Sequence, residues 1–228
     1  MILLKLGSQN NLVTYLQKKL VKLGYTIIVD GVFNDETLVA VKDFQVANGL
    51  GSDGTVGGLT WTKIYLKTET PRDTASRIER NNNILYLHPI VRAAVVKVIV
   101  QLQSEDIPFR IYEAYRYPQR QADLYAQGRT KSGSIVTYAK PWSSYHQYGL
   151  AVDFVLFENG DWSWNSSGTK EAWWAKLHQI GTAEGLMRLN FEIPHMQLAG
   201  TSSSALRQGV YPPNGDKTWS DNMKLAIR

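Results

Sequence analysis

Two histidines and two acidic residues in the second half of the chain are of the types that perform metal-assisted chemistry. His146 lies seven residues before Asp153 in the stretch SYHQYGLAVDF, and Glu192 and His195 follow in FEIPHMQL. Two histidines and one carboxylate are a common ligand set of catalytic zinc, which leaves one position open for water. In that arrangement Glu192 is the free carboxylate beside the metal. The spacing alone leaves a simpler interpretation open, in which His146 is a loop histidine ahead of a buried strand.

The position of Asp153 requires a nearby positive charge or strong donors. It lies inside the apolar run GLAVDFVLF, which we predict to be an interior strand of a sheet. A buried carboxylate without a partner costs several kcal/mol, so either a metal ion or a salt bridge would have to stabilise it.

Glu192 and His195 are three residues apart, a spacing that would place both on one face of a helix. However, Pro194 disfavours helical backbone at the residue before it. We therefore predict a turn leading into a strand, unlike the helical HExxH motif of other zinc proteases.

The composition limits the class of protein. The chain has 228 residues, 43% of them hydrophobic, which is enough for one large folded domain or two small ones. It has no cysteine, so a metal site must use His, Asp, Glu or water. No apolar run approaches the roughly 18 residues of a membrane span, and we expect no membrane insertion. The formal charge of +5 favours anionic partners such as nucleic acid, a membrane surface or a cell-wall polymer, without choosing among them.

Residues 1–66 predict a small three-helix domain. LVTYLQKKLVKLGY has leucines at helical spacing, DETLVAVKDFQVANGL repeats this design, and TWTKIYL makes a short third helix. The turns VDGVFNDET and SDGTVGGLT each contain Asp-Gly and a threonine placed to cap the next helix. Asp30 recurs as Asp53 and Thr37 as Thr60, both at an interval of 23 residues, which indicates a weak internal repeat.

This segment resembles the type 1 peptidoglycan-binding domain family. The resemblance implies a three-helix module that holds cell-wall material, in which most matching residues build the helices and turns and touch no ligand. The matches are Leu16-Gln17, Leu23-Gly24-Tyr25, Asp30-Gly31, Phe33, Thr37, Phe44-Gln45, Gly49-Leu50, Asp53-Gly54, Val56-Gly57 and Thr60-Trp61.

The polar residues 67–83 contain Pro71, and we interpret them as a linker to a second domain, residues 84–228. HPIVRAAVVKVIVQLQ, PQRQADLYAQG and TKEAWWAKLHQIGTAEG predict helices, the last of them capped near Ser167 or Thr169. PFRIYEAY, GLAVDFVLF and HMQLA predict strands, and DWSWNSSG predicts a loop. Strands and helices do not alternate regularly, which favours an α+β domain with a central antiparallel sheet over a parallel sheet.

The second domain resembles the M15 zinc peptidases, the family of bacterial D,D-carboxypeptidases and phage cell-wall endopeptidases. The resemblance extends over roughly Ile84 to Leu198. Ser144, His146, Gly149, Ala151 and Asp153 match the motif SxHxxGxAxD, and Glu192, Pro194 and His195 match [ED]xPH. The L-alanyl-D-glutamate endopeptidase branch is matched upstream by Tyr115, Arg116, Gln121, Leu124, Tyr125, Gln127, Gly128, Arg129, Thr130, Gly133, Val136, Thr137, Ala139 and Lys140.

The resemblance implies a role for each site residue. His146, Asp153 and His195 hold Zn²⁺, which lowers the pKa of its water toward about 7 and polarises the scissile carbonyl. Glu192 takes the proton of that water and later gives it to the leaving amine.

Two further residues have open alternatives. Arg116 stabilises the oxyanion or holds a substrate carboxylate, and a structural salt bridge is the alternative. Ser144 either donates a hydrogen bond to substrate or caps a turn.

Several other residues have a structural interpretation beside a functional one. We expect His88 to be a surface or capping histidine, His178 to lie at the surface or in packing, and Arg129 to brace the long loop. Four tryptophans either form a substrate wall or pack a helix on the sheet: Trp162, Trp164, Trp173 and Trp174. One departure from the endopeptidase branch is that Met187 to Asn190 replace a longer Trp- and Gly-rich segment, which leaves the substrate pocket and the bond that is cut uncertain.

We therefore predict a two-domain cell-wall lysin that cuts the L-Ala–D-Glu bond of the peptidoglycan stem peptide. The expected partner is peptidoglycan rather than nucleic acid, and the expected state is a monomer. MILLKLGSQNN contains no usual secretory signal, which fits a phage endolysin that waits in the host cytoplasm before it acts on the wall. The alternatives are a D-alanyl-D-alanine carboxypeptidase and a non-catalytic wall-binding protein.

Overall fold

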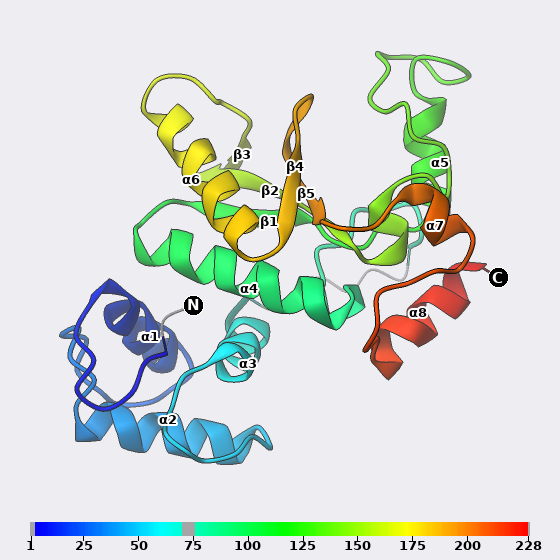
Figure 1. Cartoon of the computed structure of the whole chain (residues 1–228). Helices are drawn as coiled ribbons and strands as arrows, with labels where there is room; N and C mark the ends of the chain where they lie inside the picture. The colour runs from blue at the N-terminus through cyan, green and yellow to red at the C-terminus, as the bar shows by residue number, and fades with distance from the viewer. Residues whose placement is uncertain (1–2, 70–75, 228) are drawn as a thin grey trace. The chain divides into compact units, whose positions relative to one another are not determined.

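The structure, a computed structural model, describes residues 3–69 and 76–227 and is shown in Figure 1. Its contacts separate two compact units, of which the first combines the N-terminal helices with Val95–Phe109 and the second holds the remaining residues. The predicted domain boundaries stay predictions, and residues 70–75 of the predicted linker lie outside the described residues. No helix in the described ranges is long and apolar enough to cross a membrane.

Within residues 3–69 the chain forms the three predicted helices. They are α1 (Asn11–Lys22), α2 (Asp35–Ala47) and α3 (Gly58–Glu69). α1 packs against both other helices, and Leu16, Phe44 and Trp61 on their apolar faces are buried. α3 is longer than predicted, because it continues three residues into the segment that we interpreted as linker.

Thr37 and Thr60 do not cap the helices, contrary to the expectation. Asn34 caps α2 by accepting the N–H of Thr37 at 3.0 Å, and an amide oxygen serves as well as a hydroxyl at this position. The two threonine hydroxyls instead accept hydrogen bonds from two buried glutamines, Gln17 and Gln45.

Gln17 ties the first Asp-Gly turn to α1. Its amide nitrogen donates to Asp30 Oδ1 at 2.9 Å and to the Val32 carbonyl at 3.0 Å. Its amide oxygen accepts the N–H groups of Asp30 and Gly31 at 3.1 and 2.9 Å. The Val32 N–H also donates to Asp30 and, together with Gln17, holds the pKa of the Asp30 carboxyl below its usual value.

Gln45 repeats this arrangement at the second turn. Its amide nitrogen donates to Asp53 Oδ1 and to the Thr55 carbonyl, both at 3.0 Å, and its amide oxygen accepts the Gly54 N–H at 2.9 Å. The internal repeat is therefore a repeat of one device, a buried glutamine that satisfies the backbone of an Asp-Gly turn.

The second unit mixes strands and helices, with α4 extending into the first unit from Val95 onward. Its elements in chain order are η1 (Ile84–Tyr86), α4 (Pro89–Ser104), β1 (Phe109–Glu113), α5 (Pro118–Ala126), η2 (Tyr145–Tyr148), β2 (Ala151–Glu158), β3 (Asp161–Ser163), α6 (Thr169–Ala183), β4 (Leu186–Leu189), β5 (Glu192–Leu198), α7 (Ser203–Arg207) and α8 (Lys217–Ile227).

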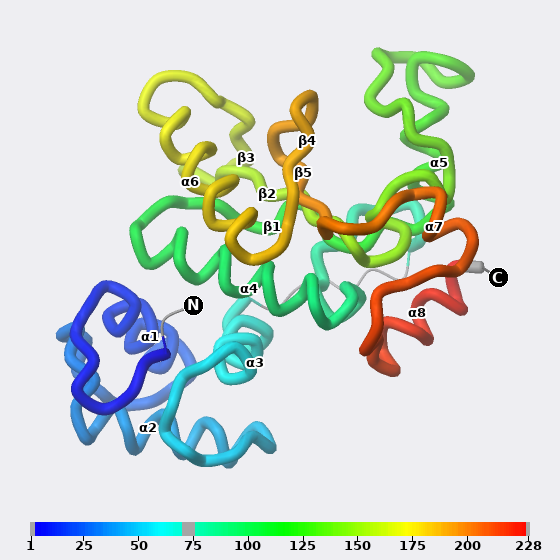
Figure 2. The backbone as a smooth tube through the Cα atoms, viewed as in Figure 1, coloured from blue at the N-terminus to red at the C-terminus, as the bar shows by residue number. Residues whose placement is uncertain are grey.

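In the described residues five strands form one sheet with the order β1–β2–β5–β4, and β3 pairs with β2. β2 is antiparallel to β3 and β5, and β4 is antiparallel to β5. α6 packs against β4 and β5, and the tube in Figure 2 shows these two strands joined by a tight turn. The prediction of an α+β domain with an antiparallel sheet is confirmed.

The predicted loop DWSWNSSG begins with a strand, β3, so that part of the prediction was wrong. Asn159 and Gly160 adopt φ angles of +52° and +86° in the turn between β2 and β3, and Glu158 faces Asp161 across this turn. Asn-Gly favours such a hairpin turn because both central residues need positive φ. The strand itself has only three residues, which is too short for an alternating pattern to reveal.

β5 begins at Glu192, where we predicted a turn. Pro194 is tolerated because the pairing of β5 with β2 begins one residue later, where His195 lies opposite Asp153, so the missing N–H removes no bond from that ladder. The turn is confined to the two residues before Glu192.

The N-terminus of α6 also differs from the prediction. Its cap is Gly168, not Ser167 or Thr169, and it makes no side-chain cap bond. A φ of +61° at this position suits a residue without Cβ. β4, α7 and α8 had no predicted counterpart.

We expect Gln17→Leu to destabilise the first unit. Gln17 is fully buried, and leucine would leave the N–H groups of Asp30 and Gly31 without their acceptor, at a cost of about 1–3 kcal/mol each. Chemical denaturation followed by circular dichroism measures the change. Gln9→Leu, at an exposed glutamine of the same unit, is the control, and equal stability of the two variants would contradict the role given to Gln17.

Candidate active site

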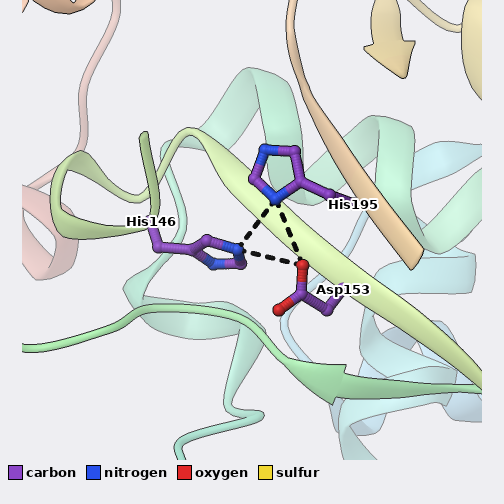
Figure 3. A group of neighbouring side chains, drawn as sticks. All are labelled: His146, Asp153 and His195. Carbon is purple, nitrogen blue, oxygen red and sulfur yellow. Dashed lines mark hydrogen bonds and ion pairs between the residues drawn. The ribbon is translucent and has the colours of Figure 1, made fainter. Parts of the chain in front are cut away.

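Three side chains predicted as metal ligands converge in the second unit, as Figure 3 shows. Asp153 on β2 lies directly opposite His195 on β5, and His146 comes from η2. The distances are 3.1 Å from His146 Nε2 to Asp153 Oδ1, 3.2 Å from His146 Nε2 to His195 Nδ1, and 3.2 Å from His195 Nδ1 to Asp153 Oδ1. All three residues are buried.

The local sequence fixes the turn that carries His146. The Ser144 side chain accepts the N–H of His146 at 3.4 Å, and Gln147 Oε1 accepts the N–H of Ser144 at 3.3 Å, which completes a capping box. Gly149 ends the turn with a φ of +65°, and a Cβ there would lie 2.7 Å from the Tyr86 carbonyl oxygen. Of the two roles considered for Ser144, the turn cap is therefore formed.

The hydrogen bonds on the far sides of the two imidazoles define which nitrogens face each other. His146 Nδ1 is 2.6 Å from the Ala114 carbonyl oxygen, which can only accept, so Nδ1 carries the proton and Nε2 has a lone pair. His195 Nε2 is 3.0 Å from Gln197 Oε1, which in the same way leaves a lone pair on Nδ1. With the rings in these tautomers, two nitrogen lone pairs and the Asp153 carboxylate face one another.

The triangle fits a tetrahedral metal ion. Bonds of about 2.0–2.1 Å at tetrahedral angles separate ligand atoms by about 3.3 Å, and the three observed separations are 3.1 to 3.2 Å. The outward hydrogen bonds to Ala114 and Gln197 are of the kind that orient metal-binding histidines.

The electrostatics of the site also favour a cation. Burial raises the pKa of a carboxyl group, but His146, His195 and Arg116 outweigh it and hold the pKa of Asp153 well below its usual range. Burial lowers the pKa of His195, but the neighbouring Asp153 outweighs it and raises that pKa above its usual value. The buried carboxylate thus stays charged and attracts positive charge to the space beside Oδ1.

Arg116 forms the salt bridge that was one of its two alternatives. Its Nη2 donates to Asp153 Oδ2 at 3.1 Å and to Glu113 Oε2 at 2.7 Å. Its Nε donates to the same Glu113 oxygen at 3.0 Å, and its Nη1 donates to Gln121 Oε1 at 3.2 Å. Burial opposes the charge on the guanidinium, but Glu113 and Asp153 raise the pKa of Arg116 above its usual value. The arginine neutralises one oxygen of Asp153 and leaves Oδ1 to the histidines.

A cleft of about 420 Å³ opens over this site. Arg116, Ser144, Glu192 and His195 line it, whereas His146 and Asp153 do not. Its walls come from the loop 135–139 and from Leu189 and Phe191 near the turn between β4 and β5. The exposed Glu192 carboxylate therefore shares the cleft with a predicted metal ligand, as a proton-transferring group requires.

The four tryptophans do not line this cleft. Trp162 and Trp164 pack edge-on against Tyr112, and Trp174 is buried and donates to the Asn165 carbonyl at 2.9 Å. The structure therefore gives no support to the substrate wall.

The remaining histidines and Arg129 have structural contacts. His88 caps α4 by accepting the Ile90 N–H at 3.3 Å, and a ring nitrogen of His178 lies 2.9 Å from the Ile193 carbonyl oxygen. Arg129 donates hydrogen bonds to the carbonyls of Tyr125 and Thr137, and these bonds brace the loop as predicted.

Sequence reasoning gave no site role to four polar residues, of which Gln121 was named only as a match to the endopeptidase branch. Glu113 holds Arg116 in place, and Gln197 orients His195. Gln121 and Gln147 are hydrogen-bonded to each other at 2.9 Å and connect α5 to the turn of His146. Gln197 could have been found, since it lies two residues after His195 on the same face of a strand.

A convergent His–Asp–His cluster on an antiparallel sheet, beside a free carboxylate, is the arrangement of a metallopeptidase domain. The family model VanY, described as D-alanyl-D-alanine carboxypeptidase, matches residues 84–198, about half of the chain. The chain therefore belongs to this family of M15 peptidases. A second model, described as a putative peptidoglycan binding domain, matches residues 9–64.

Individual proteins resemble shorter parts of the chain. The peptidoglycan L-alanyl-D-glutamate endopeptidase CwlK of Bacillus subtilis (strain 168) is 47% identical over 70 residues, which are 31% of this chain and 42% of that protein. An uncharacterised protein in the bpoA1 3′ region of Kitasatospora aureofaciens is 56% identical over 36 residues, 16% of this chain and 30% of that protein. The chain thus spans less than half of the length of these curated relatives.

Among solved structures, the Burkholderia AP3 phage endolysin is similar over 99% of this chain and 80% of its own. The sequence identity is 16% and the TM-score is 0.28.

Removal of His146 tests the metal site directly. We expect the unaltered chain to retain one equivalent of zinc after dialysis and His146→Ala to lose it, because the remaining two candidate ligands would not hold the ion. Metal content measured by mass spectrometry gives the result. His178→Ala, on the far side of the Ile193 carbonyl, should keep its metal, and a zinc-loaded His146→Ala would show that this histidine is no ligand.

Proposed function

We propose that this chain is a zinc endopeptidase that degrades peptidoglycan by hydrolysing the L-Ala–D-Glu bond of the stem peptide. The observation that carries the proposal is the triangle of lone-pair atoms from His146, Asp153 and His195, of which His195 shares an open cleft with Glu192. Membership of a peptidase family supports the reaction type. The named activity of the Bacillus relative supports the choice of bond.

His146, Asp153 and His195 would hold the zinc ion. Zinc, when bound, supplies a Lewis acid that lowers the pKa of water and polarises a carbonyl group. Glu192 takes a proton from the attacking water at its carboxylate and returns it to the leaving amine. Its exposure to the cleft lets it reach both partners.

Arg116 both holds Asp153 and keeps one N–H group for the substrate. Its guanidinium has five N–H groups, and Glu113, Asp153 and Gln121 accept from four of them. The fifth, on Nη1, is left for an oxygen of the substrate, either the developing oxyanion or a carboxylate. The rigid salt bridges fix this donor in place before substrate arrives.

The N-terminal unit would hold the enzyme on the wall. Its match to a peptidoglycan-binding family supports this role, and the net charge of +5 favours attraction to an anionic wall polymer. A phage origin, residence in the host cytoplasm before release, a monomeric state and the absence of nucleic-acid partners stay predictions.

A D-alanyl-D-alanine carboxypeptidase is the second candidate. The family model that covers residues 84–198 has this description. The short segment Met187 to Asn190 at the cleft wall also departs from the endopeptidase branch. A non-catalytic wall-binding protein is disfavoured, since the three candidate ligand residues converge and one of them, His195, shares a cleft with Glu192.

Digestion of purified peptidoglycan decides between the two activities. We expect mass spectrometry to find stem peptides cut between L-Ala and D-Glu, with new amino termini at D-Glu and no free D-Ala. Release of free D-Ala would identify the carboxypeptidase instead. Walls that stay intact with zinc present would contradict both activities.

Glu192→Gln should lower kcat by a factor of about 10²–10⁴, because the amide cannot accept the proton of the attacking water. Metal content should stay that of the unaltered chain, since Glu192 is no ligand. Glu171→Gln, at an exposed acidic residue of α6, is the matched control. Loss of zinc from Glu192→Gln would instead make this residue a ligand.

A further inference from the structure

The C-terminal segment lies beyond residues 84–198, which match the peptidase family, yet it contacts the turn that carries His146. The central contact is made by Trp219 on α8. Its indole N–H donates to the Tyr148 carbonyl oxygen at 2.8 Å, and its ring carbon Cδ1 lies 3.1 Å from the position that a Cβ on Gly149 would take. Tyr148 and Gly149 are the last residue and the cap of η2.

His88, near the start of the second unit, holds the other side of η2. The His88 N–H donates to the Gly149 carbonyl oxygen at 2.9 Å, and the His88 ring packs edge-on against Trp219 with centroids 4.8 Å apart. The two consecutive carbonyls at the end of η2 are thus bound by groups from the two ends of the second unit. His146 lies two residues before Tyr148 in a turn of only four residues. A shift of the end of η2 would therefore displace the His146 imidazole.

Trp219 itself is firmly placed. Its backbone N–H donates to Asp216 Oδ1 at 2.9 Å, and Asp216 Oδ2 accepts from Arg92 Nη1 at 2.8 Å. The indole lies against the backbone of Gly215, where a Cβ would be 2.4 Å from ring carbon Cε3. The segment before α8 therefore admits the indole only because residue 215 is glycine.

A second contact from α8 reaches the segment of Arg116. Asn222 Oδ1 accepts a hydrogen bond from the Tyr117 hydroxyl at 2.9 Å. The adjoining Arg116 N–H donates to the His146 carbonyl oxygen at 3.2 Å. One helix thus contacts both the turn of a metal ligand and the neighbour of the arginine that neutralises Asp153.

We propose that α8 positions the metal site and that Trp219 is the positioning residue. The inference rests on the proposed zinc site. It adds that α8, which lies outside the residues that match the family, helps to hold this site in place. Trp219 touches neither metal ligand nor substrate, and it acts by fixing the end of η2 so that His146 Nε2 stays within the triangle. Outer groups that orient a metal-binding histidine typically change metal affinity by roughly 10–100-fold when they are removed.

The experiment measures metal binding by the full-length chain. Trp219→Phe keeps an aromatic ring and removes the N–H that binds Tyr148, and Gly215→Ala keeps the indole but displaces it. Zn²⁺ affinity is measured by competition with a chromophoric chelator, and the visible absorption spectrum of the Co²⁺-loaded chain reports the ligand geometry. We expect both variants to bind Zn²⁺ roughly 10-fold more weakly and to show an altered Co²⁺ spectrum.

Trp173→Phe on α6, the same exchange at a tryptophan away from the cleft, is the control and should behave as the unaltered chain. Circular dichroism of each metal-free variant shows that it is folded. Zn²⁺ affinity and a Co²⁺ spectrum unchanged in both variants would overturn the positioning role while leaving the zinc site intact. If the unaltered chain binds no Zn²⁺ in the same titration, the proposed function fails and the positioning role fails with it.

Discussion

The site depends on one electrostatic constraint, the convergence of three buried electron-pair donors. His146, His195 and Asp153 bring two lone pairs and a negative charge to within 3.2 Å of one another. Such a cluster is unfavourable without a cation, because no donor lies between the three atoms. Arg116 relieves only the far oxygen of Asp153. The remaining charge must be met by a metal ion, or by a proton when metal is absent.

The fold holds this unfavourable arrangement by using rigid parts of the chain for each ligand. Backbone register between β2 and β5 sets Asp153 opposite His195, and a turn capped at both ends carries His146. Side-chain amides of buried glutamines accept hydrogen bonds from backbone N–H groups of such turns. Gln147 does so at the turn of His146, and Gln17 does so at an Asp-Gly turn of the first unit. In both units a buried glutamine fixes a turn that apolar packing could not specify, because only hydrogen bonds have the required direction.

The convergence of His146, Asp153 and His195 could be predicted because its evidence is local: a motif within ten residues for His146 and Asp153, and Pro194 beside His195. For Arg116 the sequence offered a salt bridge as an alternative but did not name its partners, since the pairing depends on Asp153 being brought beside the end of β1 from 37 residues away. Trp162 had two open interpretations for the same reason, and the structure favours packing, since the ring after the hairpin at Asn159 lies edge-on against Tyr112. The contacts of α8 had no sequence signal, because a polar amphipathic segment does not show which turn it packs against.

The floor of the cleft bears on the type of reaction, whereas its walls bear on the choice of substrate bond. The floor of the cleft contains His195 on β5, which is held against the buried Asp153 of β2 and His146 of η2, so the floor bears on the reaction type. The walls consist of a loop and a hairpin turn, where Tyr138 and Phe191 are 82% and 85% exposed. A peptide substrate would contact these walls before its carbonyl reached the cluster, so the proposed choice of bond would depend on them. The turn of two residues before Glu192 belongs to a wall, so a change in its length would leave the cluster of His146, Asp153 and His195 unchanged.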